Sequence, residues 1–373
     1  MMDFVYRQPV EILFEHHGLG KLKELVARYE GEGLLICTPH FVKDGTAERL
    51  MKEVPVIHEV FSSISVNPDI SEVEECCGLI RKHSSTFLIA LGGGSAMDLA
   101  KAAGTISQTL DPVDVYFGTG ISLPSQHLPL IAIPTTSGTG SEVTNVAVLS
   151  NRKSGKKVPM VSDNFSPDIA LIDPMLTCSV PPQVTASCGL DVLAHALEAF
   201  WSKHHQPICD ALALASCERV FQYLFQCYQH PEDEEARTKM SEASLLAGLA
   251  FAMPKTTAPH ACSYPLTNIY GIPHGEACAL TLCQFARINT DERLLQFAQK
   301  LGFQDVEDMC QCIERLQKQM KVRMDLKDMD LREDQLKDLI TLSHHPNLAN
   351  NPVEVTDDML EVIYRSLLTT REI

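Results

Sequence analysis

Asp191 and His195 are the first residues whose types and spacing suit chemistry. They lie four positions apart in the segment 189–200, which reads as a helix. Side chains four positions apart lie on one face of a helix, one turn from each other. A carboxylate and an imidazole in this arrangement can bind one metal ion together. The same spacing also suits a surface salt bridge, so the pair alone leaves both interpretations open.

Two further histidines stand among residues that end helices and strands. His260 begins the segment HACSYP, and His274 lies in the segment GIPHGE. With the first pair they would supply one carboxylate and three imidazoles. Such a set suits a divalent first-row metal, Fe(II) or Zn(II), with one coordination position open for a substrate oxygen. Cys262 and Cys278 lie nearby, but free cysteines are most often small buried hydrophobes, and we leave them out of the ligand set.

Two glycine-rich segments each follow a strand-like apolar run. They are GGGSAMDLAK, which begins at Gly92, and PTTSGTGSEV, which begins at Pro134. Glycine lets a backbone approach a phosphate closely, and the free N–H groups at a helix start bind the anion. Hydroxyl side chains between glycines can donate to a phosphate or a ribose. The two loops predict a nucleotide site, although each is also compatible with a simple turn or helix cap, and neither is a GxGxxG or P-loop fingerprint.

The elements that must position these residues divide the chain in two. The first half alternates apolar runs with helical stretches, which favours a parallel sheet covered by helices, with ligands beyond the carboxyl ends of the strands. The predicted strands are residues 33–37, 86–91, 130–133 and 169–172. After Pro181 and Pro182 the predicted elements are the helices 183–202, 207–229 and 234–251. We predict an α/β dinucleotide-binding domain over residues 1–182 and an all-helical metal- and substrate-binding domain over residues 183–373.

The composition of the chain excludes several classes of protein. Of its 373 residues, 45% are hydrophobic and 21% are charged, which is typical of globular domains. The net charge is −17, whereas nucleic-acid binding depends on clustered Lys and Arg, so we exclude a nucleic-acid partner. No apolar stretch is long enough to span a membrane, and no secretory signal is visible. The 13 cysteines include no CxxC pair, and we expect a cytoplasmic protein without a membrane partner.

The four motifs in order resemble the iron-containing (group III) alcohol dehydrogenase family along essentially the whole chain. They are GGGSAMDLAK, PTTSGTGSEVT, GLDVLAHALEAFWS, and His260 followed by GIPHGEA. The resemblance implies the dehydroquinate synthase-like fold and metal ligation by Asp191, His195, His260 and His274. It also implies Fe²⁺, with Zn²⁺ as the alternative, a nicotinamide cofactor, and a homodimer or higher homo-oligomer. The cofactor contacts that it implies are Gly93, Gly94, Ser95, Asp98, Thr135, Thr136, Thr144 and Lys157.

Two departures from the family pattern concern the proton and the cofactor. Many relatives carry a second histidine four residues after the third ligand, and here that residue is Tyr264, whose hydroxyl can donate to a substrate oxygen. Many relatives also follow the strand 33–37 with an acidic residue that discriminates against a 2′-phosphate. Here the sequence is Thr38-Pro39-His40, so both NADH and NADPH stay open, with NADH favoured.

A third departure lies in the segment 252–259, AMPKTTAP, directly before His260. Lys255 and the two threonines can form an anion-recognition site, although a lone lysine is most often exposed. The segments KTTAPHA and SYPLT resemble the branch of this family that reduces C2 aldehydes bearing a sulfonate or phosphonate. We therefore expect reduction of a short anionic aldehyde, sulfoacetaldehyde to isethionate, with Tyr264 and Lys255 as catalytic residues.

Other functions stay open at this point. Phosphonoacetaldehyde and uncharged short-chain primary alcohols are alternative substrates of the same reaction class. A dehydroquinate synthase-like lyase shares the two-domain plan, and a non-catalytic nucleotide sensor would keep the fold alone. His344 and His345 are adjacent, so their side chains diverge and we expect both at the surface. Trp201 is expected to pack in the core.

Overall fold

The computed structural model describes residues 3–329 and 331–368, which form two compact units. One unit comprises residues 7–136 and 140–178, and we call it the sheet unit. The other comprises residues 3–6, 137–139 and 179–368, and we call it the helical unit. The sequence placed the domain boundary between residues 182 and 183. In the structure the helical unit instead starts at residue 179, and it also includes the two short earlier segments 3–6 and 137–139.

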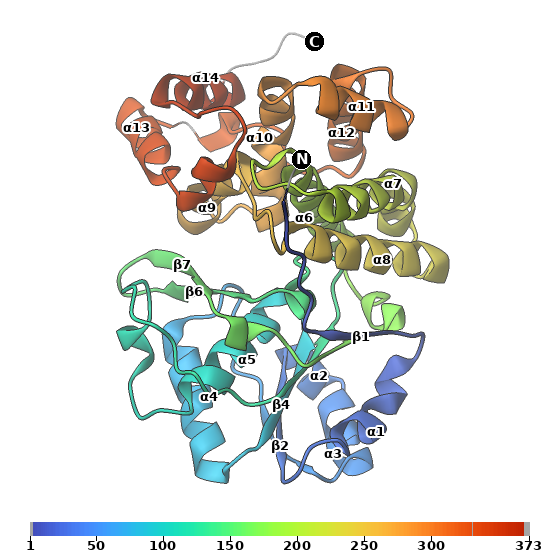
Figure 1. Ribbon diagram of the computed structural model, residues 1–373, viewed down its shortest axis with the longest axis vertical. Coiled ribbons are helices and arrows are strands. Elements are labelled where there is room, and N and C mark those ends of the chain that lie inside the picture. The colour runs from blue at the N-terminus through green and yellow to red at the C-terminus, as the bar shows by residue number, and fades with distance from the viewer. Residues whose placement is uncertain (1–2, 330, 369–373) are drawn as a thin grey trace. The chain divides into compact units, whose positions relative to one another are not determined.

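The sheet unit is built on a six-stranded sheet in which every pair of neighbours is parallel (Figure 1). In spatial order its strands are β1 (Glu11–Phe14), β8 (Ile169–Ile172), β5 (Leu130–Pro134), β4 (Phe87–Gly92), β2 (Gly33–Cys37) and β3 (Ile57–Phe61). The four strands expected from the sequence are confirmed. The expectation missed β1, β3 and the antiparallel hairpin of β6 (Val146–Asn151) and β7 (Lys156–Val161).

Helices cover both faces of this sheet, because successive residues of a buried strand point to opposite sides. Leu34 and Ile36 of β2 pack with α4 (Ile70–His83) and α5 (Gly94–Ile106). Leu35 and Cys37 of the same strand pack on the opposite face. The helices on that face are α1 (Leu22–Val26), α2 (Pro39–Lys43) and α3 (Thr46–Glu53). The predicted parallel sheet with flanking helices is therefore confirmed.

Over residues 179–329 and 331–368, which the structure describes, the helical unit consists of helices and short 3-10 turns joined by loops (Figure 1). Its helices are α6 (Pro182–Trp201), α7 (Pro207–Gln229), α8 (Glu234–Phe251), α9 (Ala258–Tyr270), α10 (His274–Ile288), α11 (Glu292–Lys300), α12 (Val306–Gln319), α13 (Glu333–Leu342) and α14 (Asp357–Leu368). Among the described residues, no helix is long and apolar enough to cross a membrane. The predicted all-helical second domain is confirmed.

Helix α6 is the central element of the helical unit. Every residue from Gly189 to Trp201 is buried, which is the pattern of a helix surrounded by others. Gly189 lets α7 approach closely, because a Cβ at this position would lie 2.1 Å from Leu224 Cδ1. The candidate ligands Asp191 and His195 therefore project from a helix that is held on all sides.

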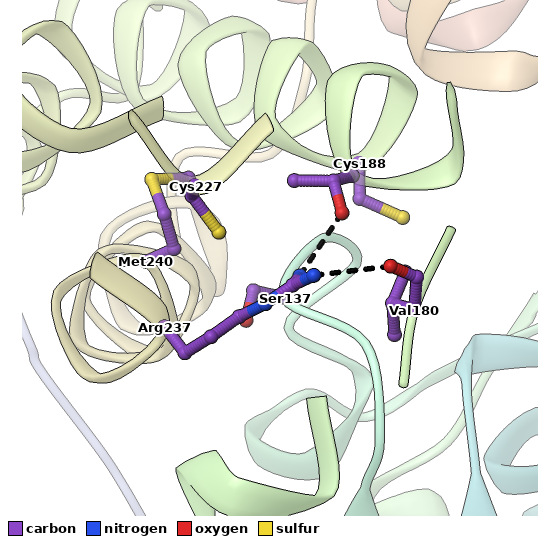
Figure 2. A pocket seen from close by; sticks show the side chains of 7 residues that line it. Ser137, Val180, Cys188, Cys227, Arg237 and Met240 are labelled. Carbon is purple, nitrogen blue, oxygen red and sulfur yellow. Dashed lines mark hydrogen bonds between the residues drawn. The ribbon is translucent and has the colours of Figure 1, made fainter. Parts of the chain in front are cut away.

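A buried arginine ties the start of α6 to α8. The guanidinium of Arg237 donates to Thr185 Oγ1 at 2.9 Å and to the carbonyls of Val180 and Pro231 at 3.0 and 2.8 Å. Figure 2 shows this group beside Ser137, whose hydroxyl lies 3.1 Å from Ser241 Oγ. These bonds satisfy a charged group inside the unit and fix the entry to the central helix.

Candidate metal and cofactor sites

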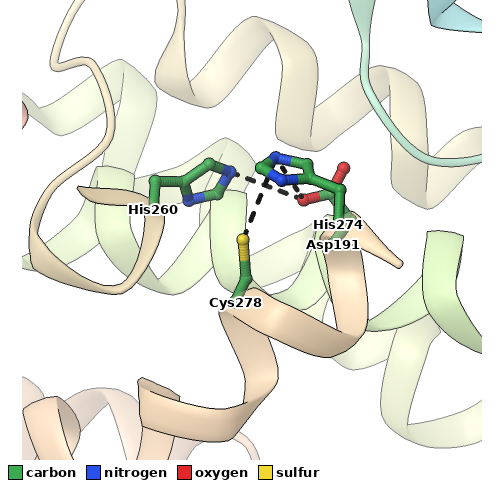
Figure 3. Close-up of side chains that lie close together, drawn as sticks. All are labelled: Asp191, His260, His274 and Cys278. Carbon is green, nitrogen blue, oxygen red and sulfur yellow. Dashed lines mark hydrogen bonds and ion pairs between the residues drawn. The ribbon is translucent and has the colours of Figure 1, made fainter. Parts of the chain in front are cut away.

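Four side chains of the helical unit converge at the first candidate site (Figure 3). Asp191 comes from α6, His260 from α9, and His274 and Cys278 from successive turns of α10. One ligand atom from each lies within 4.8 Å of the other three. His195 lies beside them, with Nε2 3.0 Å from His260 Nε2. The structure thus brings together the four residues predicted as ligands, and it adds Cys278, which the sequence interpretation had left out.

The distances among these atoms fit a bound cation. Asp191 Oδ1 lies 3.4 Å from His260 Nε2 and 3.8 Å from His274 Nε2. This oxygen is buried, yet among the described residues it has no hydrogen-bond partner. A buried unpaired carboxylate oxygen is costly unless a positive charge compensates it. A divalent metal facing one carboxylate and several imidazole nitrogens supplies that charge and suits the donor set.

The protonation of the site also suits a metal. Burial lowers the pKa of His195 to about 4, so its imidazole is neutral and can act as a ligand at neutral pH. Burial alone would raise the pKa of Asp191, but the imidazoles of His195 and His274 hold it below its usual range. Burial raises the pKa of the Cys278 thiol, so its sulfur is neutral unless a cation binds it.

The site is closed on the sides of α6 and α9 and open beside α10. The side chains of Asp191, His195 and His260 are at most 7% exposed, whereas that of His274 is 30% exposed. The ring of Phe251, the last residue of α8, stacks on His195 with centroids 4.2 Å apart. An open side next to His274 is where a substrate oxygen would enter.

Tyr264 and His345 lie together near this open side. The ring of Tyr264 is nearly parallel to that of His274, with ring centroids 6.1 Å apart. Its centroid lies 4.6 Å from that of the His345 ring. The Tyr264 hydroxyl accepts from Asn347 Nδ2 at 3.4 Å. His344 is exposed, as expected, but His345 is half-buried. The expectation of a surface position for His345 is therefore wrong, because η7 (Pro346–Asn350) packs against α9 and carries this side chain inward.

The turn between α8 and α9 carries Lys255, Thr256 and Thr257. Thr257 is fully buried, and its hydroxyl is bonded to Trp201 Nε1 at 2.8 Å and to Glu198 Oε2 at 3.0 Å. Thr257 therefore supports the metal site and does not offer its hydroxyl to a substrate anion. Lys255 is half-buried and stands in the left-handed region at φ 64.

The second candidate site lies at the carboxyl ends of β4 and β5 in the sheet unit. Gly92 pairs with Pro134 across these strands, so the two glycine-rich loops leave the sheet side by side. Gly93 is the N-cap of α5, and a Cβ there would lie 3.1 Å from Thr136 Oγ1. A glycine loop at a helix N-terminus binds a phosphate well. The structure thus brings Gly93 close to Thr136, and the role of Gly93, Gly94, Thr135 and Thr136 as cofactor contacts stays a prediction.

The remaining predicted cofactor contacts fall into two groups. Ser95 and Lys157 both bond to Asn67, at 3.3 and 2.7 Å, so they lie at the same edge of the site. Asp98 and Thr144 instead take part in hydrogen bonds that fix the segment 141–148, to which Thr144 itself belongs. Asp98 accepts from Ser141 Oγ and from the backbone N–H of Val148, and Thr144 O accepts from Lys101 at 2.9 Å.

Lys101 and Asn67 are residues that the sequence interpretation missed here. The ammonium group of Lys101 is buried and lies 2.6 to 2.9 Å from the carbonyl oxygens of Ser141, Thr144 and Val146. It therefore sets the conformation of the second glycine-rich loop. Lys101 is the last residue of the motif GGGSAMDLAK. Its place in this motif could have indicated from the sequence that it belongs to the cofactor site. Asn67 lies in a loop, where no motif marked it.

Comparisons with known proteins agree with this geometry. Residues 9–174 match the model of iron-containing alcohol dehydrogenase, and residues 185–368 match that of the Fe-containing alcohol dehydrogenase family, C-terminal. The chain belongs to the iron-containing alcohol dehydrogenase family. It is therefore an NAD-dependent oxidoreductase, and the alternatives of a lyase and of a nucleotide sensor fall away.

Three similar proteins carry more specific names. The chain is 51% identical to sulfoacetaldehyde reductase from Bifidobacterium kashiwanohense, solved in complex with NAD⁺, with a TM-score of 0.97 and 100% of both chains covered. It is 35% identical to sulfoacetaldehyde reductase of Bilophila wadsworthia, over 76% of this chain and 73% of that protein. It is also 37% identical to the 1-propanol dehydrogenase PduQ of Salmonella typhimurium, over 72% of this chain and 71% of that protein.

We predict that Gly275→Ala disrupts the metal site. A Cβ at Gly275 would lie 1.8 Å from the carbonyl oxygen of Ser187 and 3.1 Å from Asp191 Cβ. The start of α10 would have to move away from α6, taking His274 with it. We expect a loss of about 1–3 kcal/mol in the free energy of unfolding and a fall in metal affinity of about tenfold or more.

Thermal unfolding with and without metal, and competition with a chelator, measure the two effects of Gly275→Ala. Gly78→Ala is the control, because a Cβ at Gly78 meets nothing within 4 Å in the middle of α4. It should be neutral or slightly stabilising. Metal affinity equal to that of the wild type in Gly275→Ala would contradict the assigned geometry.

Proposed function

We propose that the enzyme reduces sulfoacetaldehyde to isethionate, with NADH as the hydride donor and Fe²⁺ as the metal. The observation that carries the proposal is Lys255, a cation on a turn that is attached to the metal site at both ends. Phe251, at one end of the turn, stacks on His195. Thr257, at the other end, donates to the carboxylate of Glu198, which is also bonded to His260. The two sulfoacetaldehyde reductases among the similar proteins support the same substrate.

The conformation of Lys255 supports a functional role for this residue. A lysine at φ 64 is in a region that glycine adopts far more easily, at a cost of about 1 kcal/mol or more. The backbone N–H of Lys255 donates to the carbonyl of Phe251 at 2.9 Å, which closes the turn after α8. A glycine would fit this turn with less strain. A lysine kept at this strained position, on a turn attached to the metal site, supports the proposal that its ammonium group binds a sulfonate.

Asp191, His260 and His274 would hold the metal, with His195 or Cys278 as a further donor. When bound, the cation supplies Lewis-acid polarisation of the aldehyde carbonyl, which the hydride from the nicotinamide then reduces. Asp191 contributes the negative charge that retains a divalent ion in a buried site. His274, the exposed ligand, stands at the opening through which the aldehyde enters. Zn²⁺ fits the same donors and is the alternative metal.

Tyr264 would position the substrate oxygen. Burial raises the pKa of Tyr264 to about 12, so its hydroxyl keeps the proton throughout the neutral range. A protonated phenol can donate a hydrogen bond to the oxygen that gains negative charge during hydride transfer. Asn347 Nδ2 donates to the Tyr264 oxygen, so the hydroxyl proton of Tyr264 points to a different acceptor. Tyr264 thus acts as a hydrogen-bond donor and not as a base.

The cofactor would bind at the two glycine-rich loops of the sheet unit. Gly93 and Gly94 leave room for the pyrophosphate at the start of α5, and Thr135 and Thr136 lie beside them. The strand β2 is followed by Thr38, Pro39 and His40, with Thr38 Oγ1 3.1 Å from His40 Nδ1. No carboxylate stands among these three residues to reject a 2′-phosphate, so we expect NADPH to be accepted. We propose NADH as the preferred donor because the similar sulfoacetaldehyde reductase from Bifidobacterium kashiwanohense was solved with NAD⁺.

We predict a clear preference for anionic aldehydes. The loss of NADH absorbance should give a kcat/KM for sulfoacetaldehyde about tenfold or more above that for propanal, because the sulfonate gains a charge-assisted interaction. Phosphonoacetaldehyde tests whether the site selects the sulfonate among anions. Equal kcat/KM values for sulfoacetaldehyde and propanal would overturn the proposed substrate.

A second prediction separates the role of Lys255 from its backbone strain. Lys255→Gly should raise the KM for sulfoacetaldehyde by about tenfold or more, because the anion loses its cationic partner. The KM for propanal should not change. The melting temperature should not fall, since glycine adopts a positive φ without strain.

Lys321→Gly is the matched control, because Lys321 is another lysine of the helical unit with a positive φ, of 55. It should relieve the same strain and leave both KM values unchanged. If Lys255→Gly keeps the wild-type KM for sulfoacetaldehyde, Lys255 does not recognise the anion.

A further inference from the structure

Glu198 is a buried carboxylate of the motif GLDVLAHALEAFWS, and neither the predicted ligand set nor the proposed reaction includes it. It lies on α6, and its side chain is 0% exposed. Oε1 is 2.5 Å from His260 Nδ1. Oε2 accepts from the backbone N–H of Thr257 at 2.5 Å and from the Thr257 hydroxyl at 3.0 Å. A charged group buried so completely needs a strong reason to remain in the core.

The two oxygens of Glu198 have different partners, and this difference determines the proton on His260. Trp201 Nε1 donates to Thr257 Oγ1 at 2.8 Å, so the Thr257 hydroxyl directs its own proton to Glu198 Oε2. Oε1 is left to accept from His260 Nδ1. A carboxylate only accepts, so Nδ1 of His260 must carry the proton. When a metal is bound, Nε2 carries no proton and offers its lone pair to the cation.

That lone pair points into the candidate metal site. His260 Nε2 lies 3.4 Å from Asp191 Oδ1 and 3.0 Å from His195 Nε2. A metal-bound histidine commonly donates its other ring N–H to a carboxylate, which fixes its tautomer and orientation. We propose that Glu198 is a positioning residue that keeps His260 in the Nδ1–H tautomer, and that Trp201 and Thr257 orient Glu198 for this role. The inference rests on the proposed metal site.

Glu198→Gln is the most direct test, because only one orientation of the glutamine amide satisfies the hydrogen bonds of its neighbours. Both donors of Thr257 require an oxygen at the place of Oε2, so the new NH₂ group must face His260 Nδ1. His260 would then accept at Nδ1 and carry its proton on Nε2, where the metal should bind. We expect the dissociation constant for Zn²⁺, measured by chelator competition, to rise about 10- to 100-fold.

Two further measurements keep the proposal testable if Glu198→Gln folds poorly. Nitrogen-15 NMR of the wild-type protein loaded with Zn²⁺ needs no variant and should show His260 protonated at Nδ1 and not at Nε2. Glu242→Gln is the matched control: it removes a carboxylate of α8 that bonds Arg219 and Lys239 and, within the described parts of the chain, has no hydrogen bond or ion pair to a histidine. It should leave Zn²⁺ affinity unchanged.

The outcomes distinguish this inference from the proposed function. Unchanged Zn²⁺ affinity in Glu198→Gln, or an Nε2–H tautomer of His260 in the Zn²⁺-loaded wild type, would overturn the role of Glu198 while leaving the metal site in place. A wild-type protein that binds no divalent metal would overturn both. A weakened Zn²⁺ affinity in Glu242→Gln equal to that in Glu198→Gln would show a general loss of stability and also contradict the proposal.

Discussion

The structure of the helical unit depends on one unpaired oxygen, Asp191 Oδ1. It is buried beside imidazole nitrogens and has no hydrogen-bond partner in the described parts of the chain. Leaving a carboxylate oxygen in this state costs several kcal/mol unless a cation binds. The surrounding features follow from that need: a helix buried on all sides that carries Asp191, and a glycine at position 275 that lets α10 approach it.

The support of the site extends beyond the residues that would touch a metal. Glu198, Thr257 and Trp201 form a chain of hydrogen bonds that ends on His260. The same Thr257 ends the turn that carries Lys255. The turn therefore links two tasks, because one of its residues holds a candidate ligand while another offers a cation to the substrate. A substitution in this turn can change both the metal affinity and the choice of aldehyde.

Much of the fold could be predicted from the sequence. The helices 207–229 and 234–251 were placed at their observed bounds, since proline and acidic residues mark their starts. Strands buried on both faces, such as β2 and β4, read as continuous apolar runs. The hairpin of β6 and β7 was missed because its residues are partly exposed and include three lysines or asparagines at its ends. The edge strand β1 is only four residues long.

The candidate site could be predicted less completely. Asp191 and His195 follow a helical spacing, and Glu198 continues it three residues later, so the signal for Glu198 was present in the sequence. Its partner, however, lies 62 positions away at His260, and sequence periodicity does not reveal such a contact. His345 and Asn347 reach Tyr264 in the same way, through packing of a short turn on α9. Side chains brought together by tertiary packing leave no mark in the local pattern.

The most direct measurement is a titration of the metal-free protein with Co²⁺ in the absence of oxygen, followed by visible absorption. The account predicts saturation at one Co²⁺ per chain in the wild type and no saturable binding in Asp191→Asn, because the buried carboxylate supplies the compensating charge. A near-ultraviolet charge-transfer band would show in addition that Cys278 has joined the ligands. Co²⁺ binding of equal strength in Asp191→Asn, or no binding by the wild type, would contradict the account.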